Sequence, residues 1–152
     1  MKSTMIVVAD STRARIFKWA SDDHKELKEL EDMVHTEGRL HEGDMTSDSS
    51  GKDNGPAGSG GHAYESKVNP KKQQQLEFAK QVSDYLDAAR KANKLLKLLL
   101  IVAPEFLGEL RSQFSNELGK LVVYESPKNI AGMDRSDIQK QLPKPSEYRQ
   151  VS

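Results

Sequence analysis

Three absences narrow what this chain of 152 residues can be. It has no cysteine, which excludes a disulfide scaffold, thiolate catalysis and cysteine-ligated zinc or iron–sulfur sites. It has no net charge, because 23 Lys and Arg residues balance 23 Asp and Glu residues, so binding to nucleic acid would need a local basic face. Its longest apolar run, residues 98–103, is far too short to span a bilayer.

The length and the first residues set expectations for domain organisation and location. A chain of this length fits one domain, which we expect at residues 1–143, followed by a flexible tail at residues 144–152. The sequence enters a strand-like run at residue 5 without a signal-peptide pattern. We therefore expect a cytoplasmic protein with no membrane insertion.

The first 35 residues carry strand patterns. Residues 5–9 form a continuous apolar run typical of a strand that is buried on both faces. Residues 13–19 alternate in polarity, which predicts a second strand forming a hairpin with the first. Residues 25–35 have the apolar spacing of a helix but lack a cap, and hairpin continuity favours a third strand there.

Residues 36–69 lose the apolar pattern and contain seven of the ten glycines. Such a segment buries too little apolar surface to offset its ordering entropy, so we expect a mobile Gly/Ser-rich loop. The rest of the chain alternates helix and strand patterns. In order, we expect a helix at 70–93, a strand at 98–102, a helix at 104–118 ended by Gly119, a strand at 121–124 and a short helix capped by Asp134.

This order predicts an α/β fold with a five-stranded mixed sheet, β-β-β-α-β-α-β-α, and the long loop before the first helix. By analogy, this order is similar to the ribonuclease-H-like arrangement, shared with the middle domain of eukaryotic release factors. Within the second helix, Gly108 lies between Leu107 and Leu110. Because glycine weakens a helix interior, we expect these three residues to pack closely against the sheet.

Several segments together resemble the bacterial host attachment protein family. They are residues 7–17 (VVADSTRARIF), Gly38-Arg39 with Ser47-Asp48 and Gly51, residues 78–80 with Leu86, and residues 100–111 (LIVAPEFLGELR). The resemblance covers residues 4–143. It implies a function in attachment to host cells and a fold similar to the middle domain of class-I release factors and Pelota.

The resemblance also points to Gly60, Gly61 and His62 in the long loop. In class-I release factors the corresponding loop carries a Gly-Gly-Gln tripeptide that reaches the peptidyl-transferase centre. Here His62 replaces the glutamine, and residues 36–69 hold six acidic and three basic side chains, a charge that repels RNA. The segment is therefore either a flexible linker, the interpretation we favour, or the site of a peptidyl-tRNA ester hydrolase with His62 as a candidate catalytic residue.

Basic residues gather at the end of the first predicted helix. They are Arg90, Lys91, Lys94 and Lys97, with Arg13, Arg15 and Arg111 as additions from elsewhere in the chain. This set predicts either a contact surface for RNA phosphates or a solvated helix end that complements the helix dipole. The arginines can instead pair with carboxylates at the sheet edge.

Asp10 is the second candidate catalytic residue, because ribonuclease-H-type nucleases carry a metal-binding Asp on their first strand. Two-metal catalysis needs further carboxylates, and Glu77 and Glu105 are weak candidates for them. The alternative for Asp10 is a turn-stabilising role. The four histidines lack zinc-binding spacing, and no nucleotide-binding fingerprint occurs, so we expect no metal and no cofactor.

These observations favour a non-catalytic binding protein associated with the ribosome, rRNA or tRNA. Two alternatives stay open: an enzyme, either a peptidyl-tRNA ester hydrolase or a metal-dependent nuclease, and an accessory factor in host-cell attachment. The sequence leaves a homodimer open without predicting one.

Overall fold

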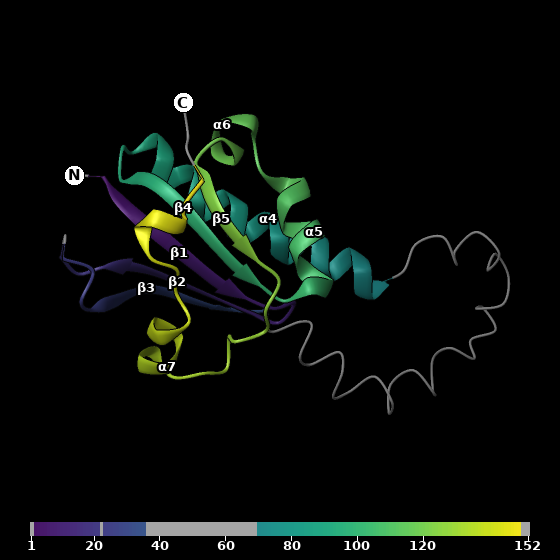
Figure 1. Ribbon diagram of the computed structural model, residues 1–152. Helices are drawn as coiled ribbons and strands as arrows, with labels where there is room; N and C mark the ends of the chain where they lie inside the picture. Colours follow the sequence, from purple (N-terminus) through teal and green to yellow (C-terminus); the bar gives the residue numbers. More distant parts are fainter. Residues whose placement is uncertain (1, 22, 36–69, 150–152) are drawn as a thin grey trace, which may run out of the picture.

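The computed structural model describes residues 2–21, 23–35 and 70–149 (Figure 1). One five-stranded sheet runs through the domain, with the strands in the order β3-β2-β1-β4-β5. The strands are β1 (Ser3–Ala9), β2 (Arg13–Trp19), β3 (Leu27–Val34), β4 (Leu95–Val102) and β5 (Val122–Ser126). The prediction of an α/β fold with a five-stranded mixed sheet is confirmed.

β1 is the central strand of the sheet. It pairs antiparallel with β2, where Val7 lies opposite Ile16, and parallel with β4, where Val7 lies opposite Leu100. β5 continues the parallel half and β3 the antiparallel half. The continuous apolar run of β1 follows from this position, because side chains on both of its faces are buried between covering layers.

β3 settles the ambiguity of residues 25–35 in favour of a strand. Its register with β2 shifts between Ile16 and Phe17, so the two strands form a bulged pair. Leu30 and Met33 of β3 still pack against the core. The helix-like spacing in the sequence joined Leu27, Leu30 and Val34, which do not share a face: Leu27 packs on the opposite side of the sheet from Leu30, and Val34 is exposed.

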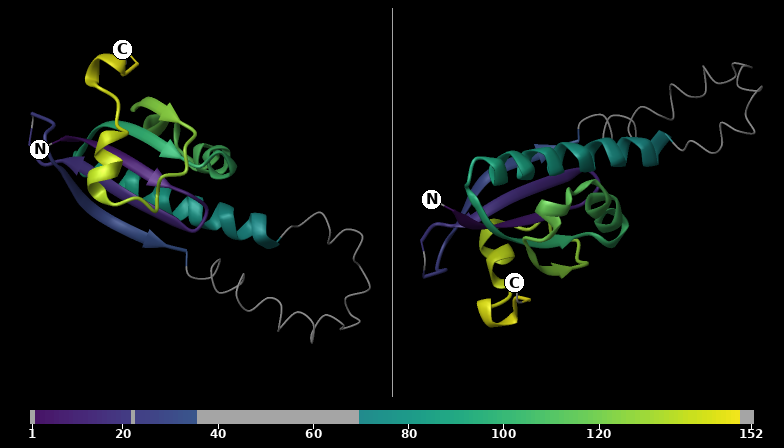
Figure 2. Two further views of the ribbon diagram at one scale, coloured as in Figure 1. Left: turned by 60° about the horizontal axis from the view of Figure 1, so that its bottom comes forward. Right: turned by 90° about the horizontal axis from the view of Figure 1, so that it is seen from above.

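Helices cover the two faces of the sheet unequally (Figure 2). One face, here called the helical face, packs against α4 (Pro70–Lys91), α5 (Pro104–Gln113) and α6 (Asn116–Gly119). The other, the thin face, packs against α7 (Arg135–Lys140), the chain before it and the residues around the short 3₁₀ helix η1 (Pro145–Glu147). α7 begins after Asp134, whose side chain accepts a hydrogen bond from the N–H of Asp137, as predicted.

The predicted helix at 104–118 is wrong in one respect, because it divides into α5 and α6. Phe114 takes an extended conformation between them, and the Ser115 hydroxyl accepts a hydrogen bond from the N–H of Leu118. Serine is a favoured N-cap residue, and here it starts a new helix. The apolar spacing persists across the break because Phe114 and Leu118 both pack against the helical face.

Two glycine predictions are also wrong. Gly108 is exposed in α5, and a Cβ atom added there would meet nothing within 4 Å, so no close packing requires glycine. Leu107 and Leu110 do pack against the core as predicted. Gly119 is the last residue of α6, and its φ angle is not positive, so it does not form a left-handed cap.

Asn93 ends α4 with a left-handed φ of 60°. The N–H of Asn93 donates to the carbonyl of Arg90, and the N–H of Lys94 donates to the carbonyl of Ala89. This pair of bonds is a Schellman motif, in which asparagine is one of the residues that tolerate the left-handed conformation. It turns the chain back toward β4 and fixes the position of Lys94.

The C-terminal residues up to Arg149 contact the sheet, where the sequence predicted a flexible tail. Tyr148 packs against the core of the thin face. Arg149 donates its backbone N–H to the carbonyl of Val123 and its guanidinium to the carbonyl of Val122, both at 2.7 Å. In the described part of the chain, no helix is long and apolar enough to cross a membrane.

Candidate functional site

The loop candidates lie outside the described residues. Gly60, Gly61 and His62 belong to residues 36–69, which the structure does not describe. The described part of the chain stops at His35, the residue after β3, and resumes at Pro70, the first residue of α4.

Asp10 stabilises the turn between β1 and β2. One oxygen of its carboxylate accepts hydrogen bonds from the N–H and hydroxyl of Thr12, at 2.8 and 2.9 Å, and from the N–H of Arg13 at 2.9 Å. This is an Asx-type turn, the structural alternative that the sequence left open. Among the described residues, which include Glu77 and Glu105, no three acidic or histidine side chains group closely enough to hold a metal ion.

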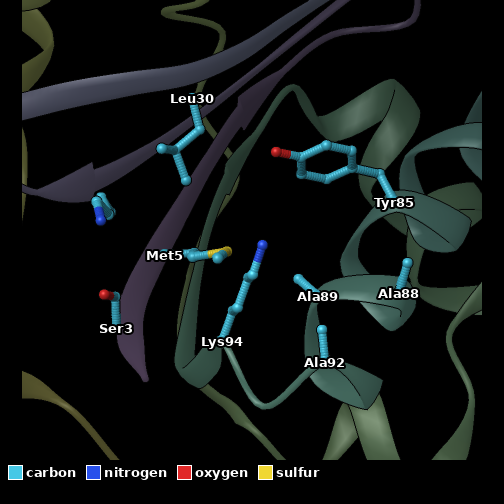
Figure 3. Close-up of a pocket in the computed structure, with 9 residues that line it drawn as sticks. Ser3, Met5, Leu30, Tyr85, Ala88, Ala89, Ala92 and Lys94 are labelled. Atoms are coloured by element: carbon cyan, nitrogen blue, oxygen red, sulfur yellow. The ribbon is translucent and has the colours of Figure 1, made fainter. Parts of the chain in front are cut away.

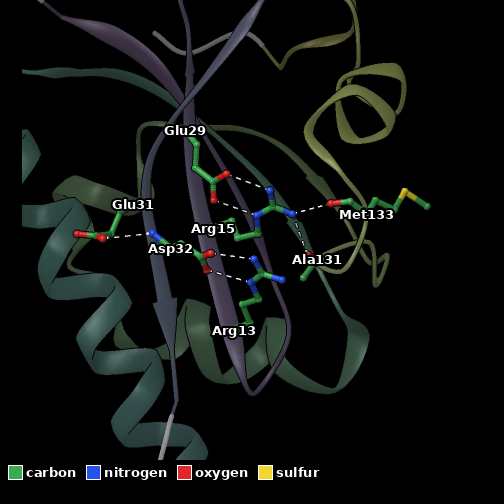
Figure 4. Close-up of polar contacts among 7 residues, drawn as sticks. All are labelled: Arg13, Arg15, Glu29, Glu31, Asp32, Ala131 and Met133. Carbon is green, nitrogen blue, oxygen red and sulfur yellow. Dashed lines mark hydrogen bonds and ion pairs between the residues drawn. The ribbon is translucent and has the colours of Figure 1, made fainter.

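Arg15 links the sheet to the chain before α7 (Figure 4). It is 7% exposed and forms a two-pronged salt bridge with Glu29 at 2.9 and 3.0 Å. Its remaining guanidinium nitrogen donates to the carbonyls of Ala131 and Met133, at 3.1 and 2.6 Å. The guanidinium also lies over the ring of Phe17, 5.2 Å from its centre. These contacts use four of the five guanidinium N–H donors of Arg15 and pair its charge with Glu29, so it is poorly placed to bind a phosphate.

The other predicted arginines are also paired. Arg13 forms a two-pronged bridge with Asp32, at 2.9 and 2.8 Å, which lowers the pKa of that carboxyl below its ordinary value. Arg111 pairs with Glu125 at 2.7 Å. The alternative in which these arginines pair with carboxylates at the sheet edge is therefore the one observed, since Asp32 lies on β3 and Glu125 on β5.

Asp87 partly neutralises the basic end of α4. It accepts a hydrogen bond from Arg90 at 2.7 Å and lies 3.7 Å from the amino group of Lys91. The bond from Arg90 is the main cause that lowers the pKa of Asp87, and a hydrogen bond from Ser115 adds to it. Lys94 and Lys97 form no ion pair within residues 2–21, 23–35 and 70–149.

The predicted basic residues do not share one surface. Arg15 points to the thin face, since it stacks on Phe17 and binds the chain before α7. Arg13, two residues earlier on the same strand, lies on that side as well. The basic end of α4 lies on the helical face, across the sheet. A single flat contact with RNA would not reach both groups.

A cavity of about 570 Å³ opens between the sheet and the last turns of α4 (Figure 3). We call it the α4 cavity. Its apolar wall consists of Met5, Leu30, Ala88, Ala89 and Ala92. Its polar groups belong to Ser3, Lys18, Tyr85 and Lys94. The volume falls within the range of roughly 300–1,000 Å³ that is typical of small-molecule sites.

The sequence creates this space with small side chains on α4. Ala89 packs against the core, and the exposed Ala88 and Ala92 line the rim of the cavity, where larger side chains would narrow it. Upstream, Leu86 is fully buried. The Schellman turn at Asn93 then places Lys94 at the cavity, and Figure 3 shows its side chain directed between Met5 and Ala89. The cavity is thus a consequence of how α4 ends.

Tyr85 and two lysines supply hydrogen-bond donors to the α4 cavity. Burial, with a smaller contribution from the Glu31 carboxylate, raises the pKa of Tyr85 above its ordinary value of 10.0. A tyrosine hydroxyl is protonated at neutral pH even at that ordinary value, so it is available as a donor. Neither Lys18 nor Lys94 has an ion-pair partner among the described residues. None of the lining residues is acidic.

Sequence reasoning found only Lys94 among these polar residues. A signal for Lys18 existed, because it follows Ala14 and Ile16 on the inward side of the alternating strand, where a charge is out of place. No signal in the sequence indicated the role of His35, which is 7% exposed and stacks parallel on Phe78 with ring centres 4.9 Å apart. A nitrogen of the His35 ring lies 3.3 Å from the carbonyl of Ser11, so this ring ties the β1–β2 turn to α4.

The fold and the cavity together define a small α/β protein with a ligand-sized site beside α4, the longest helix of the described residues. The family model described as "protein required for attachment to host cells" matches residues 5–142. The chain therefore belongs to this family. No curated protein matches the chain.

Proposed function

We propose that this protein is a non-catalytic binding protein that serves attachment to host cells, and that the α4 cavity is its binding site. Membership of the attachment family supports the biological setting. The cavity supports the molecular role, because its volume and its mixture of apolar walls with a few polar donors match the usual small-molecule site.

The single observation that carries the proposal is the state of the lysines in the α4 cavity. Asp10, Arg13, Arg15, Arg90 and Arg111 all have protein partners. Lys18 and Lys94 have no acidic partner in the described part of the chain, although both line a cavity. A concave, partly apolar site with a few charged groups is typical of small-molecule binding sites.

The test is complementation of a deletion strain. Cells that lack the protein are supplied with the wild type or with Ala92→Trp, which fills the α4 cavity from its exposed rim. Ala20→Trp is the matched control, because Ala20 is an exposed alanine that does not line the cavity. We expect the wild type and Ala20→Trp to restore the number of cells bound to host cells, and Ala92→Trp to fail although it accumulates and folds. Full restoration by Ala92→Trp would refute the proposal.

A ribosome- or RNA-associated function is a second candidate. The observation that favours it is the strand order β3-β2-β1-β4-β5, with β3 antiparallel and β5 parallel to their neighbours. By analogy, this order supports the ribonuclease-H-like arrangement expected from the sequence, which is the basis for comparing the chain with the release-factor middle domain. Lys94 and Lys97 are the predicted phosphate contacts that keep free charge within the described residues.

Co-sedimentation with ribosomes at low and high salt tests this second candidate. A salt-sensitive ribosomal fraction that is lost on Lys94→Glu with Lys97→Glu would support it. Absence from ribosomal fractions at both salt concentrations would exclude it. The ester-hydrolase alternative is tested in the same preparation by comparing peptidyl-tRNA cleavage by the wild type and His62→Ala.

A further inference from the structure

The polar and apolar groups of the α4 cavity are arranged for one kind of ligand. This inference rests on the proposed function, which makes the cavity the binding site. Its floor is apolar: Met5 is almost fully buried and Leu30 is half-buried against the same core. A ligand that fills the space must therefore present an apolar body to this floor.

The charged groups of the cavity require an anion. Lys18 and Lys94 contribute two positive charges, and no lining residue contributes a negative one. Glu31, the nearest acidic influence on Tyr85, does not line the cavity, and its carboxylate accepts a hydrogen bond from the backbone N–H of Asp32. A cation would therefore be repelled, whereas an anion supplies the two ammonium groups with a counter-charge that a neutral ligand lacks.

We propose that the α4 cavity binds a medium-length organic monocarboxylate. Its carboxylate binds the ammonium groups of Lys18 and Lys94, and its hydrocarbon body lies against Met5, Leu30 and the alanines of α4. The hydroxyls of Ser3 and Tyr85 are the neutral donors that complete the polar part of the site. Figure 3 shows the Lys94 side chain extended through the cavity beside the thioether of Met5, so charge and apolar surface are adjacent.

Size and charge argue against other anions. Inorganic phosphate or sulfate would leave the apolar wall and most of the 570 Å³ without contact. A nucleic-acid strand carries its charge along an extended backbone, whereas the basic lining residues of this site are two lysines at one recess between α4 and the sheet. The apolar wall is used only by a ligand whose hydrocarbon part enters with the carboxylate.

Isothermal titration of the full chain with octanoate tests this proposal. We expect saturable binding of one octanoate per chain, with octan-1-ol and inorganic phosphate each at least about tenfold weaker, because each lacks one of the two interactions. Lys94→Gln and Lys18→Gln should each weaken octanoate binding about tenfold. Lys120→Gln is the matched control, since Lys120 is exposed and lies outside the cavity, and it should bind as the wild type does.

The outcomes separate the ligand class from the binding site. Equal affinity for octanoate and octan-1-ol, or unchanged affinity in both lysine variants, would overturn the assignment of a carboxylate. No binding of octanoate would also overturn the ligand class. The role of the cavity would survive that result if Ala92→Trp still failed to restore attachment, and both proposals would fall if Ala92→Trp restored it.

Discussion

The two faces of the sheet are covered by different means. On the helical face, α4, α5 and α6 bury a continuous apolar cluster that includes Phe78, Leu86 and Phe106. On the thin face, α7 is six residues long and buries only Ile138. Side chains on this face reach backbone groups instead, as Arg15 does to the carbonyls before α7 and Arg149 does to the edge of β5.

Further polar contacts hold α7 in place. Gln139 accepts a hydrogen bond from the N–H of Leu27 and donates to the carbonyl of Lys25, and Arg135 donates to the carbonyl of Leu27. A long amphipathic helix is held by burial, whereas a short one needs specific hydrogen bonds because its apolar area is small. The helical face can therefore leave a gap, the α4 cavity, without losing its cover.

The largest difference between the faces is expected from deletion of core side chains. Phe78→Ala removes a ring stacked on both His35 and Phe106, and should lower the free energy of unfolding by about 4 kcal/mol. Ile138→Ala, under the short α7, should cost about 2 kcal/mol because the site can collapse more easily. Denaturant unfolding measures both, and an equal or larger loss for Ile138→Ala would contradict the comparison.

The next largest effect tests the polar anchoring of the thin face. Arg15→Gln leaves the Glu29 carboxylate and two carbonyls without their donors, and should cost about 3 kcal/mol. Arg13→Gln is the matched control on the same strand. Its pair with Asp32 is substantially exposed, so it should cost less than about 1 kcal/mol. Similar losses for the two variants would show that burial does not increase the contribution of Arg15 to the free energy of unfolding.

A smaller effect, of opposite sign, is expected at Gly108 on α5. Gly108→Ala meets no atom within 4 Å and lies inside a helix, so it should raise the free energy of unfolding by about 1 kcal/mol. Thermal and denaturant unfolding measure this gain. A loss of stability would mean that the glycine is needed for packing after all, as the sequence had predicted.

The smallest effect concerns acid stability at the end of α4. The hydrogen bond from Arg90 lowers the pKa of Asp87, so its stabilising contribution is present at neutral pH and is lost as the pH falls below about 4, through the lowered pKa. Asp87→Asn should therefore flatten the acid side of the stability profile. Adding Arg90→Gln to Asp87→Asn should change the profile little further, and an unchanged acid profile in Asp87→Asn would exclude the linkage.

Periodicity in the sequence was sufficient for the elements that are held by burial. The apolar run of β1 predicted a strand buried on both faces, and the stripe of α4 predicted a helix with one buried face, because burial determines which positions are apolar. The break at Ser115 was missed because Phe114 and Leu118 keep helical spacing while the backbone between them is extended. The spacing of apolar residues indicates which side chains are buried, but it does not indicate where the backbone hydrogen bonds of a helix end.

The candidate site was less predictable. Clustering of basic residues in the sequence suggested one surface, but Arg13 and Arg15 lie across the sheet from Arg90 and have carboxylate partners on β3. Those partners are distant in the sequence and become neighbours only through strand pairing. The α4 cavity exists because three alanines with small side chains line it. The sequence shows the alanines, but it does not show which part of the sheet lies opposite them, so the cavity could not be predicted.

Amide chemical-shift mapping of the full chain during titration with octanoate tests most directly where a ligand binds. The account predicts shifts confined to the helical face, at Ser3, Ala88, Ala89, Ala92 and Lys94, and their loss in Ala92→Trp. Shifts centred on α7 and the thin face, or on the outer surface around Lys97, would contradict the central claim that the α4 cavity is the binding site.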